Sequence, residues 1–381
     1  DLSYTVKYLE KDTNKKLAKD KTVENKTFGD EVSETAEVID GYTVDAPTKT
    51  VTITTGKNEI IFYYTKRSDL SYTVKYLEKG TNNVLAAAKT VTGQTFENKV
   101  TEKAIDIDGY TAEEPTSQNL TIKTGTNEIT FYYTKRTDLD YTVNYYEEGT
   151  NNKLQDSKKV TGQKFGDSVT EEAVAISGYN PVGEVSKTIQ IRTEKNEINF
   201  YYAKKTDLSY TVKYLEAGTD QSLADNKLVG NQTFGTEVTE KAIAINGYNV
   251  TGDSEKTIKI ADGKNEIIFY YTKKNDLSYV VNYLEKDTNK VLKEAKTETG
   301  KIYKDKVKEE APEIDGYVVS GDSEKELTID HDNSQNVINF YYTKRTDLGY
   351  TVKYLEKGTN KKLADEKTVE NQTFGDEVSE T

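Results

Sequence analysis

The sequence predicts a mainly β protein, with a small helix in each unit, built from tandem repeats arranged end to end as an elongated rod. The first observation is an opening motif, Asp-Leu-x-Tyr, that recurs at nearly fixed intervals along the chain. Such a period indicates a repeat architecture. The second is period-two alternation of apolar and polar residues, and the third is a set of small polar-Gly turns between the alternating segments. The motif begins at Asp1, Asp69, Asp138, Asp207, Asp276 and Asp347.

These positions divide the chain into five complete repeats and a truncated sixth. The predicted boundaries are 1–68, 69–137, 138–206, 207–275, 276–346 and 347–381. Each repeat is near the lower size limit at which one hydrophobic core folds unaided, so contacts between neighbours are expected to contribute. The last segment repeats the first part of repeat 1 and stops part-way, so we expect that this end is not a natural terminus.

The first predicted strand opens each repeat. Leu2, Tyr4, Val6 and Tyr8 alternate with polar residues, which is typical of a strand with one buried face. The linker from Tyr64 to Tyr72 contains no Gly or Pro, so it is not expected to act as a flexible tether. An apolar residue recurs in every linker, and we expect it to pack at the interface between neighbours or under the first strand. These junction residues are Leu70, Leu139, Leu208, Leu277 and Leu348.

The central part of each repeat is predicted to hold a helix, a turn and a further strand. Residues 30–36 begin with a residue type that caps helices and continue with acids, so they predict one or two helical turns. Gly41-Tyr42 follows a small polar residue, which suits a turn with positive φ and a short strand after it. Residues 48–54 place Val51 and Ile53 on one side of a second alternating strand.

The closing strand, residues 58–64, has two distinguishable faces. Ile60, Phe62 and Tyr64 share one face, while Ile61 and Tyr63 lie on the other. The residues equivalent to Ile61 are Thr130, Asn199, Ile268 and Asn339. A position that accepts Asn is expected to face water, so the sequence predicts that Ile60, Phe62 and Tyr64 form the core face.

Composition excludes several classes of function. The chain has no Cys and a single His, His331, so thiol chemistry, thiolate or imidazole metal clusters and repeated acid-base catalysis are not expected. The net charge of −13 argues against nucleic-acid binding, and no apolar run is long enough for membrane insertion. No catalytic motif, cofactor-binding loop or metal-ligand spacing recurs in the repeats. The sequence therefore predicts a protein that is not an enzyme and carries no cofactor or metal.

The recurring blocks resemble the mucin-binding protein (MucBP) repeats of Gram-positive cell-surface adhesins. The resemblance rests on residues 4–8, Phe28-Gly-Asp30, Gly41-Tyr42 and the closing Ile-x-Phe-Tyr-Tyr strand, and it covers essentially the whole chain. It implies a ubiquitin-like β-grasp fold in each repeat. It also implies an extracellular location on a bacterial cell wall, with the anchor outside this segment, and mucin or host glycans as partners. Neighbouring repeats of the same chain are the other expected partners.

One tyrosine of each closing strand is the candidate site for glycan stacking. It lies on the solvent side of the strand, yet it recurs while its neighbour at Ile61 varies. Strand propensity with cross-strand packing explains this recurrence, and so does a contact between repeats. A third explanation is a ladder of aromatic faces on which sugar rings stack, with many weak sites acting together. The candidates are Tyr63, Tyr132, Tyr201, Tyr270 and Tyr341.

The function favoured by the sequence is the stalk region of a bacterial surface adhesin. Such a region acts as a semi-rigid spacer and can bind host mucin glycans multivalently. Two alternatives remain open: a dedicated array of carbohydrate-binding modules that uses the exposed tyrosines, and a subunit of an extracellular fibre.

Overall fold

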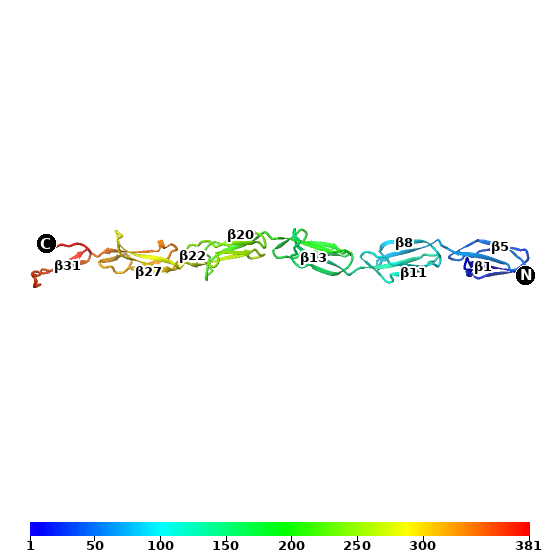
Figure 1. Cartoon of the computed structure of the whole chain (residues 1–381), viewed down its shortest axis with the longest axis horizontal. Helices are drawn as coiled ribbons and strands as arrows, with labels where there is room; N and C mark the ends of the chain where they lie inside the picture. Colours follow the sequence, from blue (N-terminus) through cyan, green and yellow to red (C-terminus); the bar gives the residue numbers. More distant parts are fainter. The chain divides into compact units, whose positions relative to one another are not determined.

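The computed structural model describes residues 1–381, and nearly all of its regular structure is β-strand. The chain divides into two compact units: residues 1–175 with 181–203, and residues 176–180 with 204–381. Figure 1 shows the strands in chain order, from the first repeat in blue to the truncated repeat in red. The single helical segment is a short 3₁₀ turn, η1 (Asn333–Gln335).

The strands of repeats 1 to 3 follow one pattern of six per repeat. Repeat 1 contains β1 (Leu2–Glu10), β2 (Lys21–Lys26), β3 (Glu31–Thr35), β4 (Tyr42–Val44), β5 (Thr48–Thr52) and β6 (Glu59–Lys66). Repeat 2 contains β7 (Leu70–Glu78), β8 (Val84–Gln94), β9 (Lys99–Lys103), β10 (Tyr110–Ala112), β11 (Ser117–Thr121) and β12 (Glu128–Lys135). Repeat 3 contains β13 (Leu139–Glu147), β14 (Lys158–Gln163), β15 (Ser168–Glu172), β16 (Tyr179–Val182), β17 (Ser186–Gln190) and β18 (Glu197–Lys204).

Repeats 4 and 5 follow the same pattern, and the truncated repeat keeps two strands. Repeat 4 contains β19 (Leu208–Glu216), β20 (Lys227–Gln232), β21 (Glu237–Lys241), β22 (Tyr248–Thr251), β23 (Glu255–Lys259) and β24 (Glu266–Lys273). Repeat 5 contains β25 (Leu277–Glu285), β26 (Val291–Lys301), β27 (Lys306–Glu310), β28 (Tyr317–Ser320), β29 (Glu324–Thr328) and β30 (Val337–Lys344). The truncated repeat contains β31 (Leu348–Val352) and β32 (Lys367–Gln372).

Each complete repeat is built around its first and last strands, which lie side by side and parallel. In repeat 1 the four-stranded sheet has the order β2-β1-β6-β4, and Lys7 of β1 is opposite Ile61 of β6. The other two strands, β3 and β5, form a separate antiparallel pair. The same order of sheet strands occurs in repeats 2, 4 and 5. In repeat 3 the strands β14, β13 and β18 lie in this order as well.

The core lies on the face of the sheet that the sequence predicts. Ile60, Phe62 and Tyr64 are essentially inaccessible to solvent, with 2%, 0% and 1% of their surface exposed, so the predicted core face is confirmed. Tyr8 stacks on Phe62, with ring centroids 6.0 Å apart. Ile53, which directly follows β5, completes this cluster and connects the two-stranded sheet to the four-stranded one. Burial of aromatic and branched side chains is the main stabilising contribution in so small a unit.

The predicted helix at residues 30–36 is wrong, and the helix implied by a ubiquitin-like fold is absent from the complete repeats. Residues 31–35 form strand β3, in which Val32 faces Val51 of β5. Asp30 does not cap a helix, because its carboxylate accepts a 2.9 Å hydrogen bond from the backbone N–H of Thr27 and closes a turn. The acidic residues that suggested a helix N-terminus are the exposed positions of an alternating strand.

A ring-on-glycine contact joins consecutive repeats. The ring of Phe96, in repeat 2, lies against Gly41 of repeat 1 and meets the ring of Tyr42 edge-on, with centroids 5.7 Å apart. Arg67 extends the contact through the backbone: its N–H donates to the carbonyl of Gly41, and its own carbonyl accepts from the N–H of Phe96, both at 2.9 Å. The ring pairs of this kind are Tyr42–Phe96, Tyr110–Phe165, Tyr179–Phe234, Tyr248–Tyr303 and Tyr317–Phe374.

Two properties of the position of Gly41 favour glycine over any other residue. Gly41 has φ of +79°, a conformation that side chains with a Cβ atom rarely adopt. A Cβ atom built on Gly41 would also overlap the ring of Phe96. Phe28, the equivalent of Phe96 in repeat 1, is 67% exposed.

Candidate functional site

The candidate site is the face of the four-stranded sheet that points away from the core. In repeat 1 the parallel pair β1 and β6 places Lys7, Glu59, Ile61 and Tyr63 on this face. Lys7 and Glu59 form an ion pair at 2.5 Å. Lys57 and Lys7 both donate hydrogen bonds to Glu59, and together they hold the pKa of its carboxyl below its usual value. A charged pair therefore occupies the centre of this face.

Repeats 2 and 4 keep this charged pair, whereas repeats 3 and 5 lack it and carry a pair of amides at the positions of Lys7 and Ile61. Lys75 pairs with Glu128, and Lys213 pairs with Glu266, each at 2.7 Å. In repeat 3 the residues opposite each other are Asn144 and Asn199, and the Nδ2 of Asn144 donates a 2.8 Å hydrogen bond to the Oδ1 of Asn199. In repeat 5 the corresponding bond joins Asn282 to Asn339 at 2.9 Å.

The five tyrosines predicted from the sequence lie on this face, one in each complete repeat. Tyr132 and Tyr201 are the most open, at 42% and 40% exposure, and Tyr63, Tyr270 and Tyr341 are half-buried. The residue beside each of them on the first strand is leucine in four repeats. In repeat 3 it is Tyr146, whose ring stacks on Tyr201 with centroids 6.0 Å apart and an interplanar angle of 30°.

A lysine beside these tyrosines was not identified from the sequence. Lys49 of β5 donates a 2.7 Å hydrogen bond to the carbonyl of Ile61, and its Nζ lies 5.6 Å from the centroid of the Tyr63 ring. The bond satisfies an edge carbonyl of β6 that no strand reaches. The equivalent donors are Gln118, Lys187, Lys256 and Lys325. The available signal was the recurrence of a long polar side chain at the second position of this strand.

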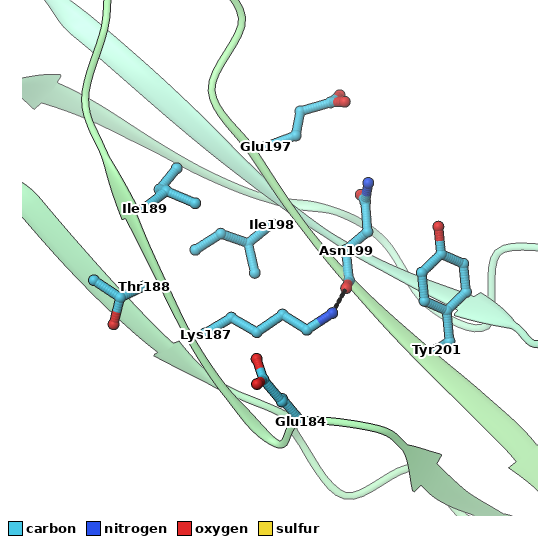
Figure 2. Close-up of a pocket in the computed structure, with 8 residues that line it drawn as sticks. All are labelled: Glu184, Lys187, Thr188, Ile189, Glu197, Ile198, Asn199 and Tyr201. Atoms are coloured by element: carbon cyan, nitrogen blue, oxygen red, sulfur yellow. Dashed lines mark hydrogen bonds between the residues drawn. The ribbon is translucent and has the colours of Figure 1, made fainter.

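A depression of about 450 Å³ lies beside Tyr201 in repeat 3. Figure 2 shows Lys187 crossing from β17 to the carbonyl of Asn199, with the side chains of Asn199 and Tyr201 projecting to the same side of β18. Glu184 and Glu197 supply carboxylates at its margin. Aromatic faces with nearby amide and carboxylate groups can stack on a sugar ring and hydrogen-bond its hydroxyl groups.

The junction leucines lie at the start of the first strand of each repeat from the second onwards. Leu70, Leu139 and Leu277 are buried, with 4% to 7% of their surface exposed, and Leu208 and Leu348 are half-buried. Leu70 belongs to the core cluster of repeat 2, against which Phe96 also packs. The sequence showed that Phe28 and its equivalents recur, but not that the ring reaches the preceding repeat. The repeat period shows that a residue recurs, but it does not show which repeat the side chain of that residue contacts.

His331 and the acidic side chains do not form a metal site. Within residues 1–381, no group of three or more His, Asp or Glu side chains is arranged to hold an ion. The ring of His331 meets that of Tyr303 edge-on at 6.2 Å, and its Nδ1 lies 2.8 Å from a carboxylate oxygen of Asp330. No helix in the structure has the length and apolar character needed to cross a membrane.

The repeated sheets, the ring-on-glycine joints and the tyrosine-bearing face define a tandem array of small β domains. Five successive segments match the MucBP domain family: residues 4–65, 72–134, 141–203, 210–272 and 280–343. The chain belongs to this family, and its repeats are MucBP repeats of the kind found in Gram-positive surface proteins. MucBP is a repeat domain of adhesins and is not an enzyme family.

Two curated relatives share the array. Internalin J of Listeria monocytogenes serotype 4b (strain F2365) is 28% identical over 358 residues, which cover 90% of this chain and 38% of internalin J. Internalin I of the same strain is 35% identical over 206 residues, which cover 52% of this chain and 11% of internalin I. The chain therefore spans well under half the length of either relative.

Among solved structures, the Bacillus anthracis TIE protein aligns with 71% of this chain and 66% of its own, at 12% identity and a TM-score of 0.30. The type 2 repeat of the mucus binding protein MUB from Lactobacillus reuteri aligns with 36% of this chain and 99% of its own. Its identity is 15% and its TM-score is 0.15.

Proposed function

We propose that this chain is the repeat region of a bacterial surface adhesin, in which it acts both as a semi-rigid spacer and as a weak, multivalent binder of host mucin glycans. The observation that carries the binding role is the solvent-facing tyrosine of each complete repeat. Each of these rings lies on the sheet face beside polar side chains, and the two most open rings are about two-fifths exposed. An open aromatic ring presents a flat face on which the C–H side of a sugar ring can stack.

Multivalency would let weak sites give useful affinity. A single stacked ring with a few hydrogen bonds binds a sugar weakly, whereas five linked sites on one chain raise the effective concentration of each for a repetitive glycan. Mucins carry many closely spaced glycans, so they suit such an array. Among the proteins that align with this chain, MUB of Lactobacillus reuteri is itself a mucus binding protein.

The spacer role is supported by the joints. The junction from Lys66 to Asp69 makes several contacts within a few residues. Lys66 pairs at 3.0 Å with Glu97 of the next repeat, and Arg67 forms two hydrogen bonds, at 3.0 and 2.9 Å, with Asp69. Thr124 of repeat 2 also donates a 2.7 Å hydrogen bond to Asp40 of repeat 1. Such linkers restrict rotation more than a flexible tether does. We place this region outside the cell, on a protein anchored to the cell wall by another segment.

The decisive experiment is retention of the full chain on immobilised mucin, compared with a variant that carries Tyr→Ser at 63, 132, 201, 270 and 341. We expect the variant to lose retention while its circular dichroism spectrum is unchanged. A matched variant with Phe at the same five positions keeps the rings and is expected to retain binding. Equal retention of the wild-type and Ser chains would refute the stacking role. Absence of mucin binding by the wild type would leave the spacer role alone.

A further inference from the structure

We propose that repeat 3 carries a built subsite for a neutral pyranose sugar, formed by Tyr146, Tyr201, Asn144 and Asn199, and that it dominates glycan binding by the array. This inference rests on the proposed glycan-binding function and deepens it. It replaces a ladder of equivalent weak sites with one principal site among weaker ones. Its basis is a combination of substitutions and contacts that the other repeats do not share.

The first step is the hydrogen-bond chain that orients the amides. The Nζ of Lys153 donates to the Oγ of Ser157 at 2.8 Å, and Ser157 donates to the Oδ1 of Asn144 at 2.6 Å. Asn144, only 4% exposed, in turn donates to the Oδ1 of Asn199 at 2.8 Å. Every bond points the same way, so each polarises the next and fixes the orientation of both amides.

The second step concerns Asn199, the last residue in this series of hydrogen bonds. Because the Oδ1 of Asn199 accepts from Asn144, its Nδ2 group faces away from Asn144, and the protein supplies no hydrogen-bond acceptor for it. Asn199 is half-buried and projects to the same side of β18 as Tyr201 (Figure 2). This amide donor is therefore available to a ligand, and a sugar hydroxyl or the carbonyl of an N-acetyl group can accept a hydrogen bond from it.

The third step is the aromatic surface. Tyr146 and Tyr201 lie opposite each other on β13 and β18 and stack at 6.0 Å. The other complete repeats have a leucine in place of Tyr146, so each of them presents a single tyrosine. Two rings form a wider platform for one sugar or for two consecutive sugars. Repeat 5 has the amide pair Asn282 and Asn339 but Leu284 in place of the second ring, so it is a half-site.

The fourth step is charge, which indicates a neutral ligand. The lysines near the site are already engaged: Lys187 with the carbonyl of Asn199, Lys195 with Glu197 at 2.6 Å and Lys153 with Ser157. Two carboxylates, Glu184 and Glu197, line the depression against one lysine, Lys187, so the net charge of the lining is negative and disfavours the carboxylate or sulfate of an acidic sugar. The Lys–Glu pair that fills the corresponding face of repeats 1, 2 and 4 is absent, because Asn144 replaces the lysine.

The test uses the full chain and two sugar probes, methyl β-galactoside as the neutral one and N-acetylneuraminic acid as the anionic one. Saturation-transfer NMR reports binding, and the side-chain amide resonance of Asn199 reports its place. We expect the neutral sugar to bind and to shift that resonance, and the anionic sugar to bind at least about tenfold more weakly, a difference of about 1.4 kcal/mol.

The matched variant carries N144K, Y146L and N199I, which are the residues that repeat 4 has at these positions. These residues already occur in a folded sibling repeat, so the fold is expected to survive, and N199I alone provides a milder version. We expect the triple variant to lose about tenfold or more in affinity for methyl β-galactoside. The control V38S changes a fully exposed residue between β3 and β4 of repeat 1, outside the tyrosine-bearing sheet, and we expect it to leave that affinity unchanged.

The outcomes separate this inference from the proposed function. If the wild type is retained on mucin but the triple variant binds the neutral sugar as well as the wild type does, the subsite is refuted and the tyrosine ladder stands. Equal binding of the anionic sugar would refute the ligand class. If neither sugar nor mucin is bound by the wild type, glycan binding itself fails, and the subsite fails with it.

Discussion

The hydroxyl of Tyr4 donates a 2.7 Å hydrogen bond to the carboxylate of Glu34, which also accepts a 2.8 Å bond from Lys21. The three side chains come from β1, β3 and β2, so the cluster ties the two-stranded sheet to the four-stranded one. It recurs in every repeat, including the truncated one. The corresponding Tyr–Glu pairs are Tyr72–Glu102, Tyr141–Glu171, Tyr210–Glu240, Tyr279–Glu309 and Tyr350–Glu380.

This cluster predicts that stability falls at both ends of the pH scale. Burial, with the hydrogen bond to Glu34, raises the pKa of Tyr4 to about 12, above the ordinary value of 10.0. The neutral phenol is thus favoured in the folded state, and its contribution is complete below pH 10 and lost as the pH rises towards 12. Burial alone would raise the pKa of Glu34, but bonds from Lys21 and Tyr4 outweigh it and lower the pKa. That contribution is present above the unfolded pKa near 4.5 and is lost as the pH falls through the lower folded value.

The measurement is the free energy of unfolding as a function of pH. We expect a plateau between about pH 5 and pH 10 with a decline on either side. Replacement of the six cluster tyrosines by Phe removes the hydroxyls and should lower the plateau. It should also remove the part of the alkaline decline that these phenols cause. An alkaline limb identical in the Phe variant and the wild type would contradict the assignment.

The ring-on-glycine joint predicts different effects for two equivalent phenylalanines. Phe96→Ala removes the ring packed against Gly41 and Tyr42, so we expect the joint to lose about 1–3 kcal/mol. Hydrogen exchange of the Arg67 and Phe96 amides, which bond across the joint, should accelerate accordingly. Phe28→Ala is the matched control, because Phe28 is 67% exposed and makes no such contact. Similar effects of the two substitutions would show that the ring does not hold the joint.

The same joint predicts that Gly41 tolerates Ala less well than Gly29 does. Both glycines have positive φ, +79° and +93°, so each substitution carries a backbone cost of about 1–2 kcal/mol. At Gly41 the added Cβ would overlap the ring of Phe96. At Gly29 no atom lies within 4 Å of the position that a Cβ would take. We therefore expect Gly41→Ala to be the more destabilising in thermal unfolding. In a Phe96→Ala background the two glycine substitutions should destabilise the protein to a similar extent. A persistent difference in thermal unfolding would contradict the overlap with the ring.

Asn58 predicts a loss of stability of another kind. It is 6% exposed, its Oδ1 accepts from the backbone N–H of Thr54 at 2.9 Å, and its Nδ2 donates to the carbonyls of Ser3 and Thr54 at 3.2 and 3.0 Å. Asn58→Ala leaves these buried groups unpaired, so we expect a cost of about 1–3 kcal/mol in the unfolding of repeat 1. Chemical denaturation followed by hydrogen exchange of the Thr54 amide measures this cost. Ser33→Ala, on the exposed side of β3, is the control, and an equal effect of the two would contradict the role of Asn58.

Local pattern was sufficient for part of the fold. The alternation of Tyr4, Val6 and Tyr8, and of Ile60, Phe62 and Tyr64, predicted both the strands and their buried faces, because side chains of a strand alternate strictly between its two sides. The period likewise predicted the repeats. Residues 30–36 were misjudged, because acids after Asp30 suit a helix start and the exposed side of a strand equally well. Pairing of Val32 with Val51 decided between them, and local sequence does not contain that pairing.

The candidate site shows the same division. The sequence alone determined that this is a tandem β-repeat protein, that the five tyrosines lie on the solvent side, and that Asn replaces Lys7 in repeats 3 and 5. Only the tertiary structure decided that Tyr146 stacks on Tyr201, that Asn144 orients Asn199, and that Phe96 packs on the preceding repeat as well as on its own. The physical reason is that these contacts join residues that are distant in sequence. They depend on the register of the parallel first and last strands and on the path of the chain from one repeat to the next.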